Sequence, residues 1–278
     1  MKLFLKTRDY AVSNEEFKLL HNEEMDMLVT SPQPRDLPRY YESESYISHT
    51  DANKTLVDKI YQVVKKFTML TKLSLANNYS NENKTLLDIG AGTGDFLLAA
   101  QNDGWSIAGI EPNAVARNKA QEKKISLTPD LESMPGKKFN VITLWHVLEH
   151  LADLENQILK IVWHLEDGGV LIVAVPNFKS YDANYYQDVW AAYDVPRHLW
   201  HFSRTSIERL FHKHGLQLIR TKPMLFDAFY VSLLSEKYKS GRSSFFNFPK
   251  ALFRGFCSNL SAWRSKEYSS IIYVLKKS

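Results

Sequence analysis

Residues Leu86 to Gly94 read L-L-D-I-G-A-G-T-G, and this stretch decides the fold of the chain. An apolar run that carries Asp88 leads into three glycines at alternate positions, which are Gly90, Gly92 and Gly94. Helical spacing of apolar residues begins immediately afterwards, at Phe96. Glycine lets a backbone turn sharply and lets a ligand approach main-chain N–H groups at a helix start. The stretch therefore predicts a buried strand, a tight ligand-binding turn and a helix.

The spacing of the glycines separates two nucleotide-binding classes. A dinucleotide fingerprint requires G-x-G-x-x-G, but the sixth position counted from Gly90 is Asp95. The pattern that is present, D-x-G-x-G-x-G, resembles motif I of class I S-adenosylmethionine-dependent methyltransferases. The resemblance implies that S-adenosylmethionine is the cofactor and S-adenosylhomocysteine (SAH) the product. It also implies the residues that line the cofactor in this turn: Asp88, Gly90, Ala91, Gly92 and Gly94.

Three later segments add candidate cofactor ligands. Glu111 and Pro112 follow the apolar run of residues 105–110, and an acid about 20 residues past such glycines suits hydrogen bonds to ribose hydroxyls. Enzymes that bind NAD use the same arrangement, so Glu111 alone does not discriminate. The family resemblance implies that Asp130 accepts from the adenine amino group with Leu131 beside the ring. Trp145 is expected either to stack on adenine or to close the pocket floor.

Strand and helix patterns alternate from residue 84 to about 222, which is typical of a parallel sheet covered by helices. We expect strands near residues 86–89, 105–110, 126–129, 139–144, 170–175, 216–220 and 270–275. Together with the resemblance, this predicts an α/β, Rossmann-like, doubly wound sheet of seven mostly parallel strands, with the seventh strand antiparallel.

The predicted domains are an N-terminal extension over residues 1–83 and a methyltransferase domain over 84–278. The extension is expected to be mostly helical or irregular, with an amphipathic helix over 56–67, and to cover the cofactor near residues 46–49. Residues 223–268 are expected to be a helical insertion before the last strand, because a tight hairpin would need far fewer residues. Its eleven aromatic residues predict a roof over the acceptor site, a homodimer interface or a membrane-surface contact, in that order.

Composition excludes several classes of protein. No run of 18 apolar residues is present, so we expect no transmembrane helix and no stable membrane insertion. The N-terminal apolar segment is short for a signal peptide, and one cysteine, Cys257, forms no internal disulfide, which predicts a cytoplasmic protein. Net charge is +4, and residues 223–268 hold seven basic and three acidic residues. No nucleic-acid motif accompanies this excess, so no nucleic-acid partner is expected.

The segment from His146 to His150 reads H-x-x-E-H, which is also an inverted zinc-protease pattern. Zinc binding by this motif needs one continuous helix, whereas the strand of residues 139–144 runs directly into it. The segment also resembles quinone-biosynthetic O-methyltransferases, some of which hold a divalent cation here with an acid at the position of His146. A histidine weakens binding of a hard cation, and we expect no metal.

A second histidine cluster, Asp194 to Phe202, reads D-V-P-R-H-L-W-H-F and lies between the fifth strand and the next helix. Family members carry a similar segment there. Its histidines, aromatics and arginine suit an acceptor pocket, and a tight loop held by histidine hydrogen bonds is the alternative.

The expected reaction is methylation, favouring an oxygen of a small molecule or saccharide, with a histidine as general base. The candidate bases are His146, His198 and His150. An NAD-dependent oxidoreductase and a non-catalytic scaffold of the same fold are the alternatives.

Overall fold

The computed structural model describes residues 1–41, 56–241 and 247–277. Its centre is a six-stranded sheet in the order β5-β4-β6-β7-β10-β9. The strands are β4 (Thr85–Ile89), β5 (Ser106–Ile110), β6 (Phe139–Trp145), β7 (Leu165–Pro176), β9 (Leu216–Pro223) and β10 (Ser270–Lys277). β4 pairs in parallel with β5 and β6, and β6 with β7, whereas β10 runs antiparallel between β7 and β9. The antiparallel last strand is therefore confirmed.

The prediction of seven strands is wrong by one. Residues 126–129 contribute a single bridge, between Ile110 and Thr128, beyond the edge strand β5. Pro129 follows directly and has no N–H to extend the ladder, so the pairing ends there.

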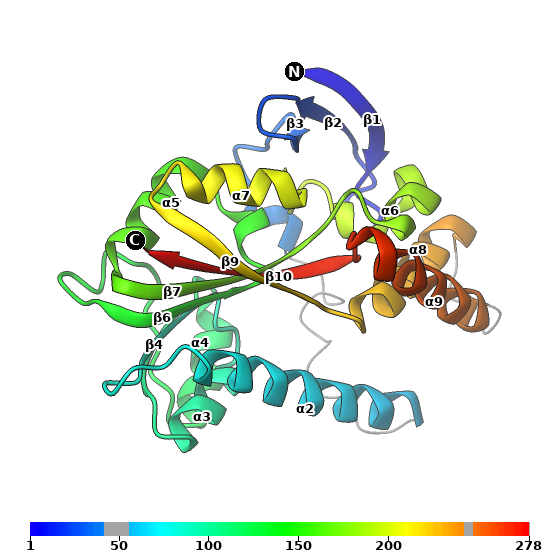
Figure 1. Cartoon of the computed structure of the whole chain (residues 1–278). Coiled ribbons are helices and arrows are strands. Elements are labelled where there is room, and N and C mark those ends of the chain that lie inside the picture. The colour runs from blue at the N-terminus through cyan, green and yellow to red at the C-terminus, as the bar shows by residue number, and fades with distance from the viewer. Residues whose placement is uncertain (42–55, 242–246, 278) are drawn as a thin grey trace.

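Helices cover both faces of this sheet (Figure 1). α2 (Leu56–Asn77), α3 (Asp95–Asn102) and α4 (Ala114–Glu122) lie on one face, and α5 (Leu154–Trp163) and α7 (Arg204–His212) on the other. Alternate residues of β7 supply the two cores: Val170 and Ile172 face α2 and α3, while Leu171 and Val173 face α5 and α7. This arrangement is the doubly wound one that the sequence predicts.

The N-terminal region differs from the expectation of helical or irregular structure. β1 (Lys2–Arg8), β2 (Glu16–Asn22) and β3 (Met27–Ser31) form an antiparallel sheet that β8 (Trp200–His201) completes. Leu19 and Leu28 are fully buried on its inner side, so the alternating pattern of these segments reflects strands. The expected helix over 56–67 is present as the first part of α2. The expected cover at residues 46–49 lies outside the described residues.

Short helices complete the chain. They are the 3-10 turns η1 (Pro38–Tyr41), η3 (Leu148–His150), η4 (Gln187–Val189) and η5 (Ala191–Tyr193), and α6 (Tyr181–Tyr186). The segment expected as a helical insertion contains α8 (Asp227–Ser240) and α9 (Asn247–Ser265), which lie side by side at one end of the molecule (Figure 1). No helix among the described residues has the length and apolarity to cross a bilayer.

Candidate functional site

The glycine turn connects β4 to α3 at the carboxyl edge of the sheet. Gly90, Gly92 and Gly94 have φ angles of 74°, 54° and 76°, a left-handed conformation that side chains other than glycine rarely adopt. The N–H groups of Gly90 and Ala91 donate to the carbonyl of Ile110, at 2.8 and 2.9 Å, which ties the turn to β5. Main-chain hydrogen bonds therefore hold the start of the turn, and Lys123 Nζ donates to the Thr93 carbonyl and hydroxyl further along it.

The three glycines differ in what surrounds them. A Cβ at Gly90 would lie 2.3 Å from Val147 Cγ2, and one at Gly94 would lie 3.2 Å from Ala120 Cβ, so these two permit close packing. A Cβ at Gly92 would meet nothing within 4 Å. The space into which a Gly92 side chain would extend is thus open. We call the turn and Glu111 together the glycine cradle.

Glu111 lies at the end of β5 and faces the turn. Its Oε2 accepts from the N–H of Gly92 at 2.9 Å, and its Oε1 accepts from the N–H of Asn113 at 2.9 Å. Each carboxylate oxygen has a further lone pair, so the bonds that hold the side chain leave capacity for two ligand hydroxyls. The adjacent Pro112 is exposed at the start of the loop to α4.

Asp130 and Leu131 follow the bridge that joins Thr128 to β5. The N–H of Glu111 donates to the Thr128 carbonyl at 2.9 Å, so this loop and the cradle share one edge. Asp130 is exposed, and its Oδ1 accepts from the N–H and Oγ–H of Ser133. Leu131 is buried in the core that also contains Ile110. Leu131 therefore supports the floor of this edge from within the core.

Asp88, Lys72 and Trp145 meet beneath the turn. Asp88 is buried and accepts from Thr143 Oγ1 at 2.6 Å, and its burial raises its pKa to about 7. The Lys72 ammonium lies 4.5 Å from the centre of the Trp145 ring, whose other contact is the edge of Phe96. Burial lowers the pKa of Lys72, opposed by the charge of Asp88. The Trp145 ring packs against Phe96 and Lys72, while its indole Nε1 has no hydrogen-bond partner among the described residues.

His146 leaves the sheet at the end of β6. Its φ is 58°, and its N–H donates to the Ala174 carbonyl of β7. Nε2 lies 3.0 Å from Asp227 Oδ2, at the start of α8, and Nδ1 lies 3.4 Å from Glu149 Oε1. Burial alone would lower the pKa of His146, but the two carboxylates raise it above its usual value. His146 thus links Asp227 of the insertion to Glu149, and both carboxylates favour its protonated form.

Glu149 is the carboxylate on which three histidines converge. Its side chain is 1% exposed, and neither oxygen has a hydrogen bond of normal geometry among the described residues. His198 Nε2 lies 4.0 Å from Oε1, and His198 Nδ1 is 2.9 Å from the Ala192 carbonyl, which fixes the proton on Nδ1. Burial would raise the pKa of Glu149, but His146 and His198 lower it.

His150 and His198 pack edge to face, with ring centres 4.5 Å apart. His150 Nδ1 lies 3.0 Å from both the Tyr41 hydroxyl and the Arg197 carbonyl. Burial lowers the pKa of His150 to about 4, so the ring is neutral at pH 7. The liganding atoms of Glu149, His150 and His198 lie within 4.8 Å of one another, an arrangement that could hold a metal ion. His146 lies outside that group, and the H-x-x-E-H segment is a strand end followed by η3, which excludes the single helix of a zinc-protease motif.

Arg197 and His201, from the second histidine cluster, have structural partners. The Arg197 guanidinium is 1% exposed and forms ion pairs with Asp9 at 2.9 Å and Asp194 at 2.6 Å. His201 Nε2 lies 3.0 Å from Thr30 Oγ1. The tight-loop alternative is therefore right for these two side chains, which hold the N-terminal sheet against the loop.

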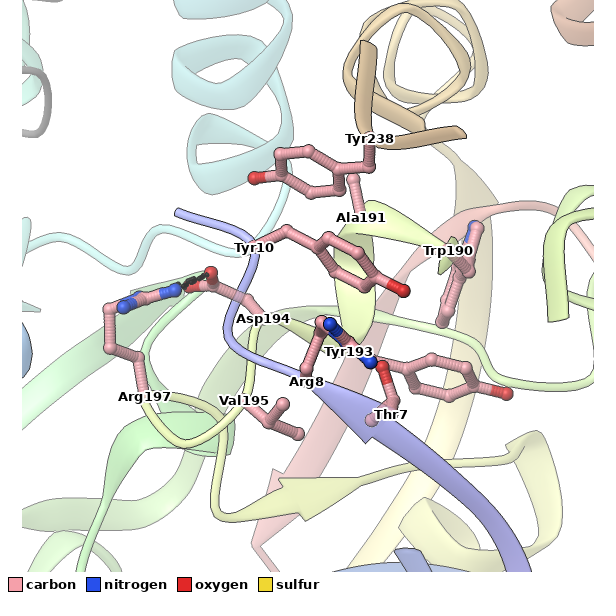
Figure 2. Close-up of a pocket in the computed structure, with 10 residues that line it drawn as sticks. All are labelled: Thr7, Arg8, Tyr10, Trp190, Ala191, Tyr193, Asp194, Val195, Arg197 and Tyr238. Carbon is pink, nitrogen blue, oxygen red and sulfur yellow. Dashed lines mark hydrogen bonds and ion pairs between the residues drawn. The ribbon is translucent and has the colours of Figure 1, made fainter. Parts of the chain in front are cut away.

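Figure 2 shows the aromatic residues near the ion pair of Arg197 with Asp194. Tyr10 stacks on Tyr238 of α8 with ring centres 5.1 Å apart, and Trp190 and Tyr193 line the same cavity. The cavity has a volume of about 10 Å³, which is room for one water molecule. It is a packed junction between the N-terminal sheet, the loop and the insertion, and is too small for an organic ligand.

Sequence reasoning missed Lys72, Tyr41 and Asp227 as members of the site. Asp227 is the clearest case, because it lies in the insertion and nothing in the surrounding sequence points to His146. An acid at the start of a helix is also the ordinary residue for that position. Only the path of the chain could have revealed these three.

Comparison with known proteins gives the family. The sequence model of the methyltransferase domain family matches residues 64–221. The ubiquinone biosynthesis O-methyltransferase of Chelativorans sp. (strain BNC1) is 33% identical over 105 residues, which are 34% of this chain and 42% of that protein. The match thus spans less than half the length of that curated relative.

Solved structures show the same fold. The magnesium protoporphyrin IX methyltransferase of Synechocystis PCC 6803, solved with bound SAH, superposes with a TM-score of 0.54 at 16% identity, covering 87% of this chain and 92% of that one. The [4+2]-cyclase SpnF superposes with a TM-score of 0.52 at 16% identity, covering 74% and 80%. Because that structure is described as a cyclase, the fold alone does not fix the reaction.

Proposed function

Because this chain belongs to the class I S-adenosylmethionine-dependent methyltransferase family, we propose that it transfers a methyl group from S-adenosylmethionine to an oxygen of a small molecule or saccharide. The observation that carries the proposal is the glycine cradle, where Gly92 has open space beside it and donates its N–H to Glu111. The similarity to an O-methyltransferase supports oxygen as the acceptor atom.

Residues in the cradle and beside it suit different parts of the cofactor. The free lone pairs of Glu111 suit the two ribose hydroxyls, and Asp130 lies at the same edge for the adenine amino group. Asp88 and the open main chain at Gly92 suit the amino acid end, because a carboxylate favours an ammonium. Leu131 and Trp145 support the floor.

The cofactor supplies an electrophilic methyl group on its sulfonium. The chain must then hold the acceptor in line with that methyl group, and such positioning is worth up to about 7–11 kcal/mol of barrier. The start of α8 reaches the site through Asp227, which pairs with His146 at 3.0 Å. We infer that this end of the insertion roofs the acceptor.

His150 is the proposed general base. It is neutral at pH 7, its Nδ1 is occupied by the Arg197 carbonyl and the Tyr41 hydroxyl, and its ring is only partly buried. Nε2 is therefore the nitrogen that can accept a proton from a hydroxyl. The adjacent Glu149 carboxylate stabilises the imidazolium that forms.

His198 and His146 then serve as positioning residues. His198 packs its ring against His150, and its Nδ1–H is donated to Ala192. His146 already carries its proton between two carboxylates, so it is a poor proton acceptor. Its role is to fix Glu149 and Asp227 on opposite sides of one ring.

Calorimetry of the whole chain with SAH and with NAD tests the cofactor. We expect SAH to bind and NAD not to bind, and the reverse result would favour the oxidoreductase. Glu111→Ala should weaken SAH binding by about 1–3 kcal/mol, through lost hydrogen bonds to a charged acceptor. Glu122→Ala on exposed α4 is the matched control.

Mass spectrometry tests the reaction. The chain is incubated with S-adenosylmethionine and a panel of catechols and monosaccharides, each beside its amine analogue. We expect a methylated hydroxyl compound and no methylated amine. Preferred methylation of the amines would overturn the assignment to oxygen. SAH binding without any methylated product across the panel would favour the non-catalytic scaffold.

A further inference from the structure

The α9 helix is built with its large apolar residues on the outside. Its buried side is formed largely by small residues, Ala251, Gly255, Ser258 and Ala262, and Ser258 Oγ donates to Asp182 of α6 at 2.7 Å. A Cβ at Gly255 would lie 2.5 Å from the Phe229 ring of α8, so the two helices touch at that point. The attachment of α9 to the protein therefore uses its small residues.

The opposite side of α9 exposes six large apolar side chains. They are Phe248, Leu252, Phe253, Phe256, Leu260 and Trp263, and their exposed fractions run from 41% to 68%. At 3.6 residues per turn, they occupy an arc of about 140° along a helix about 28 Å long. With half of each side chain in water, the arc presents on the order of 500 Å² of apolar surface. No described residue covers it, and patches of this size on soluble monomers are usually functional.

The charges of α9 indicate what kind of surface this exposed arc could bind. Residues 247–266 contain Lys250, Arg254, Arg264 and Lys266 and no acid. By the same helical spacing, Lys250, Arg254 and Arg264 lie along one border of the apolar arc. Arg254 rests over the Tyr185 ring, at 3.9 Å from its centre, while Lys250 and Arg264 are exposed.

A second copy of the chain is a poor occupant. Two α9 helices related by a twofold axis would bring like charges together, because the helix has no acid to pair with its own bases. An anionic bilayer matches both features. Its acyl boundary accepts the aromatic and leucine side chains, and its headgroups accept lysine and arginine.

We propose that the exposed face of α9 docks reversibly, in the plane of the interface, on an anionic phospholipid membrane. The helix lies on the surface and does not span the bilayer. The buried side of α9 stays packed on α8 and α6 while its apolar face is exposed, so docking needs no unfolding of the insertion.

Flotation of the full chain with phosphatidylcholine vesicles, with and without phosphatidylglycerol, tests the proposal. We expect wild type to float with the anionic vesicles and to be released by high salt. Trp263→Ser combined with Phe253→Ser and Phe256→Ser should lower vesicle binding at least about tenfold, from lost apolar burial. Trp163→Ser on α5, where the indole is also about half exposed, should leave binding unchanged.

Charge reversal tests the second feature. Lys250→Glu with Arg264→Glu should lower binding to anionic vesicles at least about tenfold, because each basic residue near the surface contributes about 1 kcal/mol. Lys6→Glu with Lys18→Glu on the N-terminal sheet is the matched control. Circular dichroism and SAH affinity report that each variant is folded.

Two results would overturn the proposal. One is wild type that fails to float with anionic vesicles at low salt. The other is a concentration-dependent dimer in sedimentation that Trp263→Ser abolishes, with vesicle binding unaffected by the same change. The second result would assign the face to another copy of the chain.

Discussion

The glycine cradle and the cluster of His146, Glu149, His150 and His198, which we call the histidine side, are built in different ways. The cradle consists of the glycine turn and Glu111, and main-chain N–H groups of the turn make its principal bonds. The histidine side draws on β1, η1, η3, the loop of residues 194–201 and α8, and side chains make most of its bonds. A local main-chain site depends on glycine at fixed positions, whereas an assembled site depends on the packing of the whole fold. Substitutions should therefore affect the two halves differently.

Gly92→Val gives the largest expected effect. The branched side chain would fill the open space beside the turn and strain a φ of 54°, so SAH binding should be abolished in calorimetry. Gly104→Val is the matched control, because Gly104 has a φ of 86° and equally open surroundings away from the cradle. Wild-type SAH affinity in Gly92→Val would show that the cofactor does not bind at the cradle.

His150→Ala should lower kcat by about 10²–10⁴-fold with the best acceptor of the panel, which is the usual contribution of a histidine base. SAH affinity should stay within about twofold, since the cradle is untouched. The accompanying readout is the pH profile of kcat, whose acid limb should vanish in the variant. Loss of both SAH affinity and turnover in the variant would instead show that His150 supports the folded structure and is not the base.

Arg197→Met should lower the free energy of unfolding by about 3–5 kcal/mol, because it leaves Asp9 buried without its partner. Arg8→Met is the control, since the ion pair of Arg8 with Glu16 is exposed and worth at most about 1 kcal/mol. Denaturant titration gives both values. Equal effects of the two substitutions would contradict the view that the histidine side depends on this buried junction.

Acid should weaken cofactor binding through Asp88. Its pKa of about 7 means that the carboxyl is mostly protonated at pH 6 and mostly ionised at pH 8. An ammonium ligand favours the ionised form, so SAH affinity at pH 6 should be about tenfold lower than at pH 8. Asp88→Asn should flatten this dependence. A wild-type affinity that is constant from pH 6 to pH 8 would exclude Asp88 from contact with the charged end.

Metal removal should give the smallest effect. Turnover is expected to survive EDTA, because the one carboxylate among Glu149, His150 and His198 is already balanced by the protonated His146. Loss of turnover in EDTA, restored by Zn²⁺ or Mg²⁺, would indicate that those three residues bind a metal ion.

The acidic limit of stability follows from the histidines. His150 and His201 have pKa values lowered by burial, so below pH 6.5 these two side chains bind more protons in the unfolded chain than in the folded chain. Stability contributed by these two groups is therefore lost as the pH falls from about 6.5 toward 4. This loss of stability at low pH involves His150 and His201 and not the glycine cradle, because the cradle contains no histidine.

The sequence by itself indicated the six strands of the central sheet, the glycine turn and the position of Glu111 at the end of β5. Periodicity and glycine spacing act over a few residues, and the chain folds locally as they indicate. It did not determine the N-terminal sheet, although Phe17 and Leu19 alternate with Glu16 and Lys18, as strand residues do. Those strands are short, and the sheet is completed by β8, which pairs with β3 from a distant part of the chain through Leu28 with His201 and Val29 with Trp200.

Only the tertiary structure decided which groups surround the histidines. Identical side chains at His146, His150 and His198 differ because Asp227, Tyr41 and Ala192 reach them from remote segments. The same holds for α9, whose amphipathic pattern is visible in sequence but does not say which face is covered. Small residues touch α8 and large apolar residues remain outside, because the burial of a side chain depends on its neighbours in space and not on its own hydrophobicity.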